Sequence, residues 1–258
     1  MTDPIFRTEG GLLVPSGHAR SPWDPNQQHG GAPAALAVRV IEALAPEMQV
    51  ARLTVEFLGT VPLEALLVEA EIWRPGRRMQ LAQATISLAD GRTACRASAV
   101  LLHRQQLEGL PAGTGGPPLA QGPEEGRLEE WDDPAAEAFY RTAMDMRWVA
   151  GTWAKGPGTV WFRFARPVVD DEEPSPAMRA AAAADFGNGI SQMLGFGRWL
   201  FINTDLTVQL HRQPEGEWVA VDAETILQPG GVGLARSILH DTRGPVGTGA
   251  QTLYVAPR

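Results

Sequence analysis

One acidic residue, Asp185, interrupts an otherwise apolar stretch that runs from Ala180 to Phe186. Because burying a charge without a partner is costly, this carboxylate either faces solvent or belongs to a site. In a site, an aspartate can orient a water molecule and accept a proton from it. Asp185 is therefore a candidate general base, and an exposed helix residue is the alternative interpretation.

A second candidate is the segment His29-Gly30-Gly31, which precedes an Ala-rich run that is free of glycine. Glycine permits close approach of the backbone, and the free N–H groups at the start of a helix attract negative charge. Such N–H groups can form an oxyanion hole. A flexible junction between a loop and a helix needs the same residues, so both interpretations stay open.

The sequence offers little support for other kinds of active site. The remaining histidines lack the i, i+4 spacing of a zinc-binding helix: His18, His103, His211 and His240. Ser191 and Ser237 lack the G-x-S-x-G elbow of a serine nucleophile. The single Cys95 excludes a disulfide framework and a cysteine-based zinc site, and we expect it to be an inert core residue. We therefore expect neither a metal nor a cofactor.

The elements that must position these residues follow the same order in both halves of the chain. In the first half, a helix is expected over Ala32–Ala45 and strands over Val50–Leu58, Leu66–Trp73, Gln80–Ala89 and Thr93–His103. In the second half, a helix is expected over Pro176–Met193 and strands over Phe201–Arg212, Trp218–Leu227, Gly233–His240 and Gly249–Val255. This pattern predicts an α+β chain in which an antiparallel sheet wraps one face around each long helix.

The two halves also share short sequences at an offset of 153 residues. Leu53-Thr54-Val55 matches Leu206-Thr207-Val208, and Val68-Glu69-Ala70-Glu71 matches Val221-Asp222-Ala223-Glu224. Their common order indicates an internal duplication. From Gly109 to Gly126, ten of eighteen residues are Gly or Pro, which is typical of a linker. We expect an N-terminal repeat at 1–105, a Gly/Pro-rich linker at 106–130 and a C-terminal repeat at 131–258, with one continuous antiparallel sheet.

This duplicated pattern resembles the hot-dog fold, and two tandem copies resemble the double hot-dog acyl-CoA thioesterases of the thioesterase II type. The resemblance is carried by His29-Gly30-Gly31, Asp185, Asn203-Thr204-Asp205, His211-Arg212 and Gln251. It implies that fatty acyl-CoA is hydrolysed by a water molecule, held by Asp185, by Gln251 and by a hydroxyl or amide residue. Alignment on His211-Arg212 leaves Asn203 and Thr204 as alternatives for that last position. His29, Gly30 and Gly31 are the expected substrate-binding residues.

The resemblance also implies one active site per chain, carried mainly by the second half. Single-domain hot-dog thioesterases with the same tripeptide carry their acid further along the helix that follows it. Val38 occupies that position here, and the only acid on the helix is Glu42. At the offset of 153, Ser98 occupies the place of Gln251. Glu42 and Asp205 are the alternative acids if Asp185 is not the base.

Two other functions stay open. A hydratase or dehydratase of the same double hot-dog fold acts on enoyl-CoA with an aspartate and a histidine five residues later, but Ile190 stands at that position here. A non-catalytic acyl-binding protein has no need for Asp185 and Gln251 together. The pair Arg77-Arg78 is expected to be a solvated turn, and a contact with the CoA phosphates is the less favoured alternative.

Composition limits the partners. The 258 residues carry 22 Lys and Arg against 30 Asp and Glu, and the net charge of −8 disfavours binding to nucleic acid. No apolar run approaches the roughly 20 residues that span a bilayer, and the N-terminus does not have the pattern of a signal peptide. We expect a cytoplasmic protein with an acyl-CoA substrate that associates as a homodimer or a higher homo-oligomer.

Overall fold

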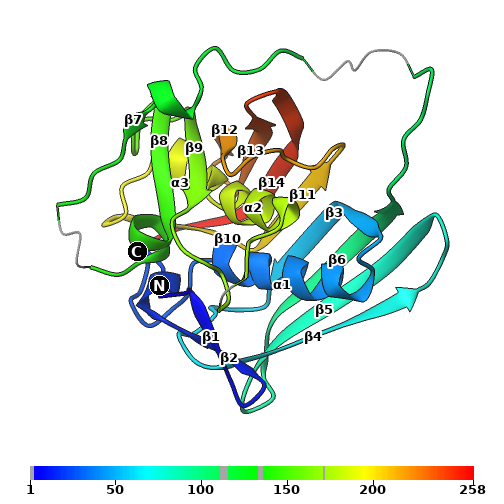
Figure 1. Ribbon diagram of the computed structural model, residues 1–258. Helices are drawn as coiled ribbons and strands as arrows, with labels where there is room; N and C mark the ends of the chain where they lie inside the picture. Colours follow the sequence, from blue (N-terminus) through cyan, green and yellow to red (C-terminus); the bar gives the residue numbers. More distant parts are fainter. Residues whose placement is uncertain (1–2, 111–115, 133–135, 171) are drawn as a thin grey trace.

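The computed structural model describes residues 3–110, 116–132, 136–170 and 172–258 (Figure 1). The elements of the first half are β1 (Phe6–Glu9), β2 (Leu12–Pro15), η1 (Gly17–Ala19), α1 (Gly31–Leu44), β3 (Met48–Phe57), β4 (Leu66–Arg74), β5 (Met79–Leu88) and β6 (Thr93–His103). Those of the second half are η2 (Pro123–Glu125), β7 (Arg127–Leu128), η3 (Phe139–Ala143), β8 (Met144–Ala150), β9 (Gly158–Phe164), α2 (Pro176–Ala184), α3 (Gly187–Ser191), β10 (Trp199–Asn203), β11 (Asp205–Leu210), β12 (Val219–Leu227), β13 (Val232–Asp241) and β14 (Gly244–Pro257).

The strands form one antiparallel sheet, as the sequence predicts. The order is β1-β2-β4-β5-β6-β3-β11-β14-β13-β12-β9-β8-β7, and β10 also pairs with β14. The two halves meet where β3 pairs with β11, and Thr54 stands opposite Thr207 there with the two hydroxyl oxygens 3.2 Å apart. These two threonines are equivalent at the offset of 153, so the two halves are related by an approximate two-fold axis that passes between them.

The helices lie inside the curve of this sheet (Figure 1). α1 and α2 pack against each other, and the side of each that faces the core is rich in buried alanine. Small side chains let two helices approach each other and the sheet closely. The core therefore lies between the helix pair and the sheet. Within the described ranges, no helix is long and apolar enough to cross a membrane.

The first half agrees with the elements expected from the sequence. α1 and β3–β6 begin and end within two residues of their expected bounds. The turn between β5 and β6 is formed by Asp90 and Gly91: the Asp90 carboxylate accepts a hydrogen bond from the N–H of Arg92 at 2.9 Å, and Gly91 has a φ of +85°. Only glycine adopts that angle readily, which explains why this dipeptide marks a hairpin.

The second half differs from the expectation in three elements; one of them is β14, which runs from Gly244 to Pro257 instead of from Gly249 to Val255. The helix expected over Pro176–Met193 is divided into α2 and α3, and the interruption falls at Asp185 and Phe186. The strand expected over Phe201–Arg212 is divided at Thr204 into β10 and β11. β11 lies between β3 and β14, whereas β10 pairs with β14 alone, so the chain changes its pairing partners at this residue.

The helix is interrupted where a side chain from β14 enters it. In a continuous helix, the N–H of Asn188 would bond to the carbonyl of Ala184, and the carbonyl of Asp185 would also accept a helical bond. The side chain of Gln251 takes both places, since its Oε1 accepts from the N–H of Asn188 at 2.8 Å and its Nε2 donates to the carbonyl of Asp185 at 3.0 Å. A side chain that inserts into the helical ladder in this way breaks the helix.

The expected linker is partly structured. Residues 111–115 lie outside the described residues. Near its end, η2 is followed by β7, and β7 pairs with β8 at the edge of the sheet. This edge belongs to the second half.

Candidate active site

Asp185 is a buried carboxylate on which polar side chains from both halves converge. Its side chain is 3% exposed. Oδ1 accepts hydrogen bonds from Nδ2 of Asn203 at 2.9 Å and from Nε2 of Gln251 at 3.2 Å, and Oδ2 lies 2.9 Å from Nδ1 of His29. These groups offset the cost of burying the charge. Of the two interpretations of Asp185, the structure agrees with membership of a site rather than with an exposed helix residue.

His29 is held in a fixed orientation against this carboxylate. Its ring stacks on Phe139 at a centroid distance of 4.9 Å and lies 4.5 Å from Phe186, and its backbone N–H donates to the carbonyl of Ala19. Nδ1 is also 3.1 Å from the N–H of Gly31. Nδ1 thus faces both an acceptor, Oδ2 of Asp185, and a donor, the N–H of Gly31; a protonated Nδ1 donates to the carboxylate, and an unprotonated Nδ1 accepts from Gly31.

The two glycines after His29 allow the start of α1 to approach α2. A Cβ atom on Gly30 would lie 2.9 Å from Oδ2 of Asp185 and 2.7 Å from the ring of Phe57. A Cβ atom on Gly31 would lie 2.9 Å from the carbonyl oxygen of Ala182. Only a residue without a Cβ fits at either place, which is the close backbone approach that the sequence suggests. Among the described residues, the N–H of Gly30 has no acceptor and is available to a ligand.

Gln251 has a fixed amide orientation. It is 1% exposed, and its Oε1 is occupied by the N–H of Asn188. The NH2 group must therefore face Asp185, where it reaches both the backbone carbonyl and Oδ1. The side chain of Asn188 in turn donates to the carbonyl of Phe201 at 2.9 Å. Asn188 is not among the residues predicted from the sequence; its signal is a polar residue between two glycines, Gly187 and Gly189, three residues after the candidate acid.

Asn203 and Thr204 have different surroundings. Asn203 contacts Asp185, whereas the exposed Thr204 directs its hydroxyl to Asp205 Oδ1 and to the carbonyl of Thr252, both at 3.3 Å. Successive side chains of an extended strand point to opposite faces, so only one of the two can reach the helix side. The structure brings Asn203 into the cluster and leaves Thr204 outside it.

The positions that correspond to the site in the first half lack its polar groups. Thr54 pairs with Ser98 and Thr207 pairs with Ala250, so the pairing register makes Ala99, not Ser98, equivalent to Gln251. The alignment of the two halves at a constant offset of 153 residues, which placed Ser98 opposite Gln251, is therefore wrong by one residue in this strand. Val38 is buried and apolar. Glu42 lies near the other end of α1, where burial raises the pKa of its carboxyl and Ser175 hydrogen-bonds to it.

Cys95 lies near the site but is not reactive. It is fully buried in β6, and burial together with the negative charge of Asp185 raises the pKa of its thiol to about 12. A thiol with such a pKa is protonated at neutral pH and is a poor nucleophile. No cluster of three or more His, Cys, Asp or Glu side chains suited to a metal ion occurs in the described part of the chain.

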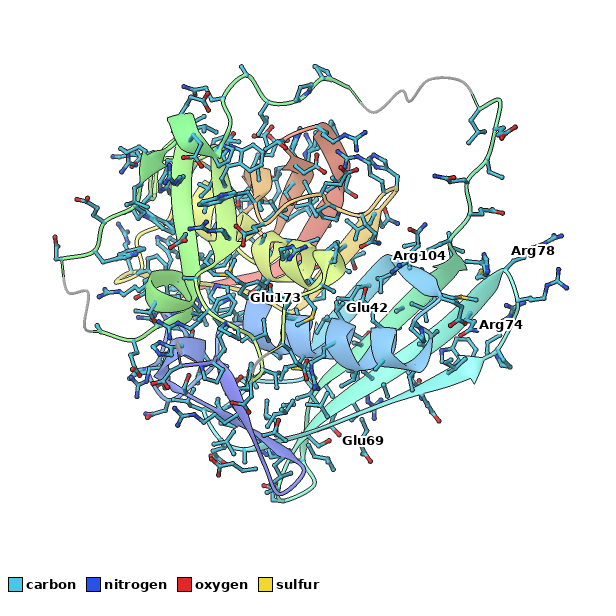
Figure 2. All side chains as sticks on the ribbon, viewed as in Figure 1. Glu42, Glu69, Arg74, Arg78, Arg104 and Glu173 are labelled. Atoms are coloured by element: carbon cyan, nitrogen blue, oxygen red, sulfur yellow. The ribbon has the colours of Figure 1, made fainter. Side chains whose placement is uncertain are left out.

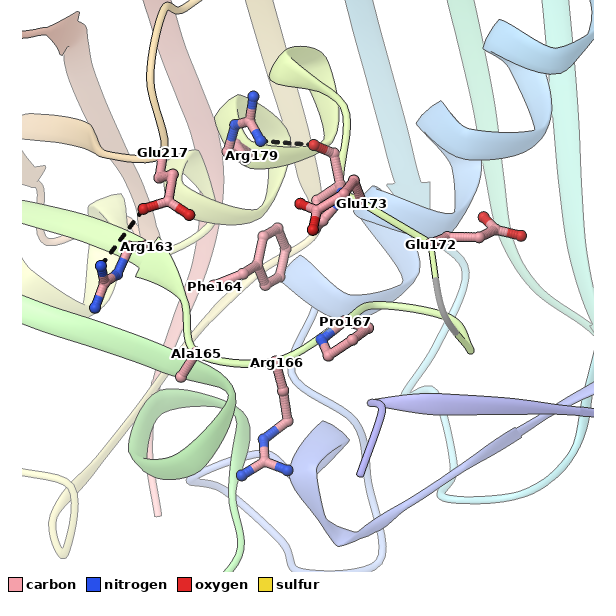
Figure 3. A pocket seen from close by; sticks show the side chains of 10 residues that line it. Arg163, Phe164, Ala165, Arg166, Pro167, Glu172, Glu173, Arg179 and Glu217 are labelled. Carbon is pink, nitrogen blue, oxygen red and sulfur yellow. Dashed lines mark hydrogen bonds and ion pairs between the residues drawn. The ribbon is translucent and has the colours of Figure 1, made fainter. Parts of the chain in front are cut away.

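Three surface clefts are lined by residues other than Asp185 and the side chains that contact it. Figure 3 shows one of about 170 Å³ near the start of α2, where Arg163 pairs with Glu217. A second, of about 510 Å³, runs along the end of α1 beside Glu42. The third, of about 470 Å³, lies at the β4–β5 turn with Arg74 and Arg78 (Figure 2).

Comparison with solved structures identifies the class of fold. The chain is similar to a hot-dog protein of unknown function from Alicyclobacillus acidocaldarius, with 17% identity, a TM-score of 0.71, and coverage of 97% of this chain and 95% of that one. It is also similar to a candidate thioesterase II from Thermobifida fusca, with 16% identity, a TM-score of 0.75, and coverage of 97% and 94%. A third is an acyl-CoA thioesterase II from Mycobacterium marinum, with 17% identity, a TM-score of 0.64, and coverage of 98% and 94%. The chain therefore has a hot-dog fold.

Family models give the narrower assignment. The model of the acyl-CoA thioesterase N-terminal domain matches residues 19–102, and the model of the acyl-CoA thioesterase C-terminal domain matches residues 120–255. The chain belongs to this acyl-CoA thioesterase family, which confirms the resemblance that the sequence motifs suggest. No curated protein matches the chain.

Proposed function

We propose that the protein is a tandem double hot-dog acyl-CoA thioesterase that hydrolyses fatty acyl-CoA to the free acid and CoA. The observation that carries this proposal is the convergence of His29, Asn203 and Gln251 on the buried carboxylate of Asp185. The two-fold relation at Thr54 and Thr207 and the family assignment support the tandem arrangement. The site is composite, because His29 comes from the first half and the other groups come from the second.

In the proposed reaction, a water molecule binds at Oδ1 of Asp185, next to the amides of Asn203 and Gln251. Asp185 accepts a proton as the water oxygen attacks the thioester carbonyl carbon, so a C–O bond forms. The C–S bond then breaks, and the thiolate leaves and takes up the proton. A positioned general base contributes about 10²–10⁴-fold to such a step. The chemistry needs no metal or cofactor, because the thiolate is a good leaving group.

The start of α1 is the proposed site of the carbonyl oxygen. The N–H of Gly30 has no acceptor in the described part of the chain, and the N-terminal end of a helix stabilises negative charge. Gly30 also lies directly against Asp185, so a carbonyl bound there is next to the water. His29 contacts Oδ2 of Asp185, so that Oδ1 is directed at the two amides. The proposed role of His29 is to position Asp185.

One alternative shares part of this geometry. A hydratase of the same fold needs a histidine beside its aspartate, and His29 lies beside Asp185 although Ile190 occupies the expected position. The test is a comparison of two reactions. We expect thiol release from saturated acyl-CoAs, followed with a thiol-reactive dye over increasing chain length. Loss of enoyl-CoA absorbance without thiol release would assign the site to hydration instead. If neither reaction is detected, the protein is an acyl-binding protein without catalytic activity.

We further propose a cytoplasmic homodimer or higher homo-oligomer. Exposed apolar side chains on the outer face of the second half of the sheet support self-association: Ile226, Leu234, Ile238 and Tyr254. Sedimentation at micromolar concentration tests this proposal, since a species of only 27.8 kDa would contradict it.

A further inference from the structure

An aromatic surface adjoins the candidate active site. The carbonyl of Phe201 accepts a hydrogen bond from Asn188, which also holds Gln251, and the ring of Phe201 lies 4.8 Å from that of Trp23. Trp23 and Phe196 are 4.7 Å apart. Trp23 comes from the loop that leads to His29, and Phe196 comes from the loop between α3 and β10. Phe196 is 38% exposed and Trp23 is partly exposed, so this surface can be reached from solvent.

Two arginines without acidic partners border this surface. The guanidinium of Arg258 lies 5.6 Å from the ring centroid of Trp23, and the N–H of Arg258 donates to the carbonyl of Arg198 at 3.1 Å. Within the described residues, neither guanidinium forms an ion pair. The nearest acid in the sequence around Trp23 is Asp24, and its carboxylate accepts bonds from its own loop, from Asn26 at 2.8 Å and from Gln27 at 3.4 Å. Among the described residues, the surface therefore carries two guanidinium groups without ion-pair partners beside one carboxylate that is hydrogen-bonded within its own loop, in a chain with a net charge of −8.

The position of the arginines matches the length of a pantetheine arm. β10 connects Arg198 to Asn203, which contacts Asp185, and five extended residues span about 17 Å. A pantetheine arm has about thirteen bonds from its sulfur to the first phosphorus, which is roughly 15 Å when extended. A thioester at Asp185 would thus bring the phosphates of its carrier to the end of β10.

We propose that Trp23, Arg198 and Arg258 bind the nucleotide end of coenzyme A. The two guanidiniums pair with the phosphates, and the adenine stacks on the exposed aromatic surface of Trp23 and Phe196. This inference rests on the proposed thioesterase function, and it identifies the acyl carrier as a nucleotide rather than a protein.

Two arginines far from this surface serve as a matched control. Arg77 and Arg78 line the cleft at the β4–β5 turn, and Arg78 has no ion pair among the described residues (Figure 2). This turn lies beyond the C-terminal end of α1, whereas Asp185 contacts its N-terminal end. The 14 residues of α1 alone span about 21 Å, so a phosphate at this turn is out of reach of an extended arm.

The test compares two substrates with the same acyl group, one on CoA and one on N-acetylcysteamine, which has neither phosphate nor adenine. For the double variant Arg198→Ala/Arg258→Ala, we expect KM for acyl-CoA to rise about 10- to 100-fold through loss of charged hydrogen bonds. The kcat for acyl-CoA and the rate with the N-acetylcysteamine thioester stay unchanged. Trp23→Leu raises KM for acyl-CoA by a smaller factor. Arg77→Ala/Arg78→Ala leaves both substrates unaffected.

Binding of adenosine 3′,5′-bisphosphate, measured by calorimetry, gives a readout without hydrolysis. We expect binding to the parent protein and to Arg77→Ala/Arg78→Ala, and at least tenfold weaker binding to the Arg198→Ala/Arg258→Ala protein. Binding without thioester hydrolysis would support this site and contradict the proposed function. Hydrolysis with equal losses on both substrates, an unchanged KM, or a loss confined to the Arg77→Ala/Arg78→Ala protein would overturn the inference.

Discussion

Replacement of the candidate base tests the chemistry most directly. In Asp185→Asn, the remaining oxygen can accept from Asn203 and Gln251 as Oδ1 does now, and the new NH2 group faces His29. A neutral imidazole can move its proton to Nε2 and accept from that NH2 group through Nδ1. The hydrogen bonds are thus retained, and only the proton acceptor is lost.

The expected magnitude follows from this difference. We expect kcat to fall about 10²–10⁴-fold, equivalent to about 3–5 kcal/mol of transition-state stabilisation. KM changes little, because the groups that bind the substrate are intact. The melting temperature of Asp185→Asn is expected to equal or exceed that of the parent. In contrast, Asp185→Ala removes the side-chain acceptor that Asn203 and Gln251 share and the oxygen that faces His29, and each buried donor left unpaired costs about 1–3 kcal/mol unless water enters.

The assay is continuous thiol release from a saturated acyl-CoA, with thermal melts of the same samples. Glu42→Gln is the matched control, since Glu42 is the acid of α1, is half-buried and makes no contact with Asp185 in the structure described here. We expect near-parental turnover for this control. Turnover of Asp185→Asn within about threefold of the parent would refute the assignment of the base.

The remaining predictions address individual contacts. Gln251→Ala lowers kcat less than loss of the base, but it destabilises the fold by about 1–3 kcal/mol for each buried backbone group left unpaired, which chemical denaturation measures. Asn203→Ala lowers kcat, whereas Thr204→Ala leaves it near the parental value in the same assay. Cys95, with a thiol pKa of about 12, stays unmodified by thiol reagents at pH 8 until the protein unfolds; rapid labelling of the native protein would contradict its burial. Burial lowers the pKa of His240 below 6.5, so the unfolded chain binds a proton more readily than the folded chain does. The free energy of unfolding is therefore at its full value above pH 6.5 and falls as the pH is lowered. Urea titrations should show a smaller fall for His240→Phe.

The sequence predicts best those elements whose signals are local. α1 and β3–β6 follow from an Ala-rich run, alternating strands and the Asp90-Gly91 turn, each of which is contained within a few residues. The division between α2 and α3 could not be predicted in this way. It depends on the side chain of Gln251, which lies 66 residues from Asp185 in the sequence.

The candidate site was predictable by residue type but not by arrangement. Asp185 was identifiable as a carboxylate in an apolar stretch, and Gln251 through the family resemblance, yet their amide–carboxylate contact follows only from the fold. The contact between His29 and Asp185 joins two halves of the chain, and no local pattern reports it. The equivalence of Gln251 with Ala99 required the pairing register, because a shift of one residue moves every side chain to the other face of a strand.

The pairing of Thr54 with Thr207 relates the two halves of the sheet, and the polar cluster lies on one side of this relation among the described residues. At one end of the helix pair, Gln251 enters the helical ladder, interrupts the helix at Asp185 and directs an amide at the carboxylate. At the equivalent place, Ala99 has no group that could do so, and α1 continues unbroken through 14 residues. One amide side chain thus accounts both for the difference between the helices and for the polar site. By this reasoning, the polar site and the helix break are coupled: Gln251→Ala removes the partner of the Asn188 N–H and of the Asp185 carbonyl, so the loss of stability and the fall in kcat should appear together in this one variant.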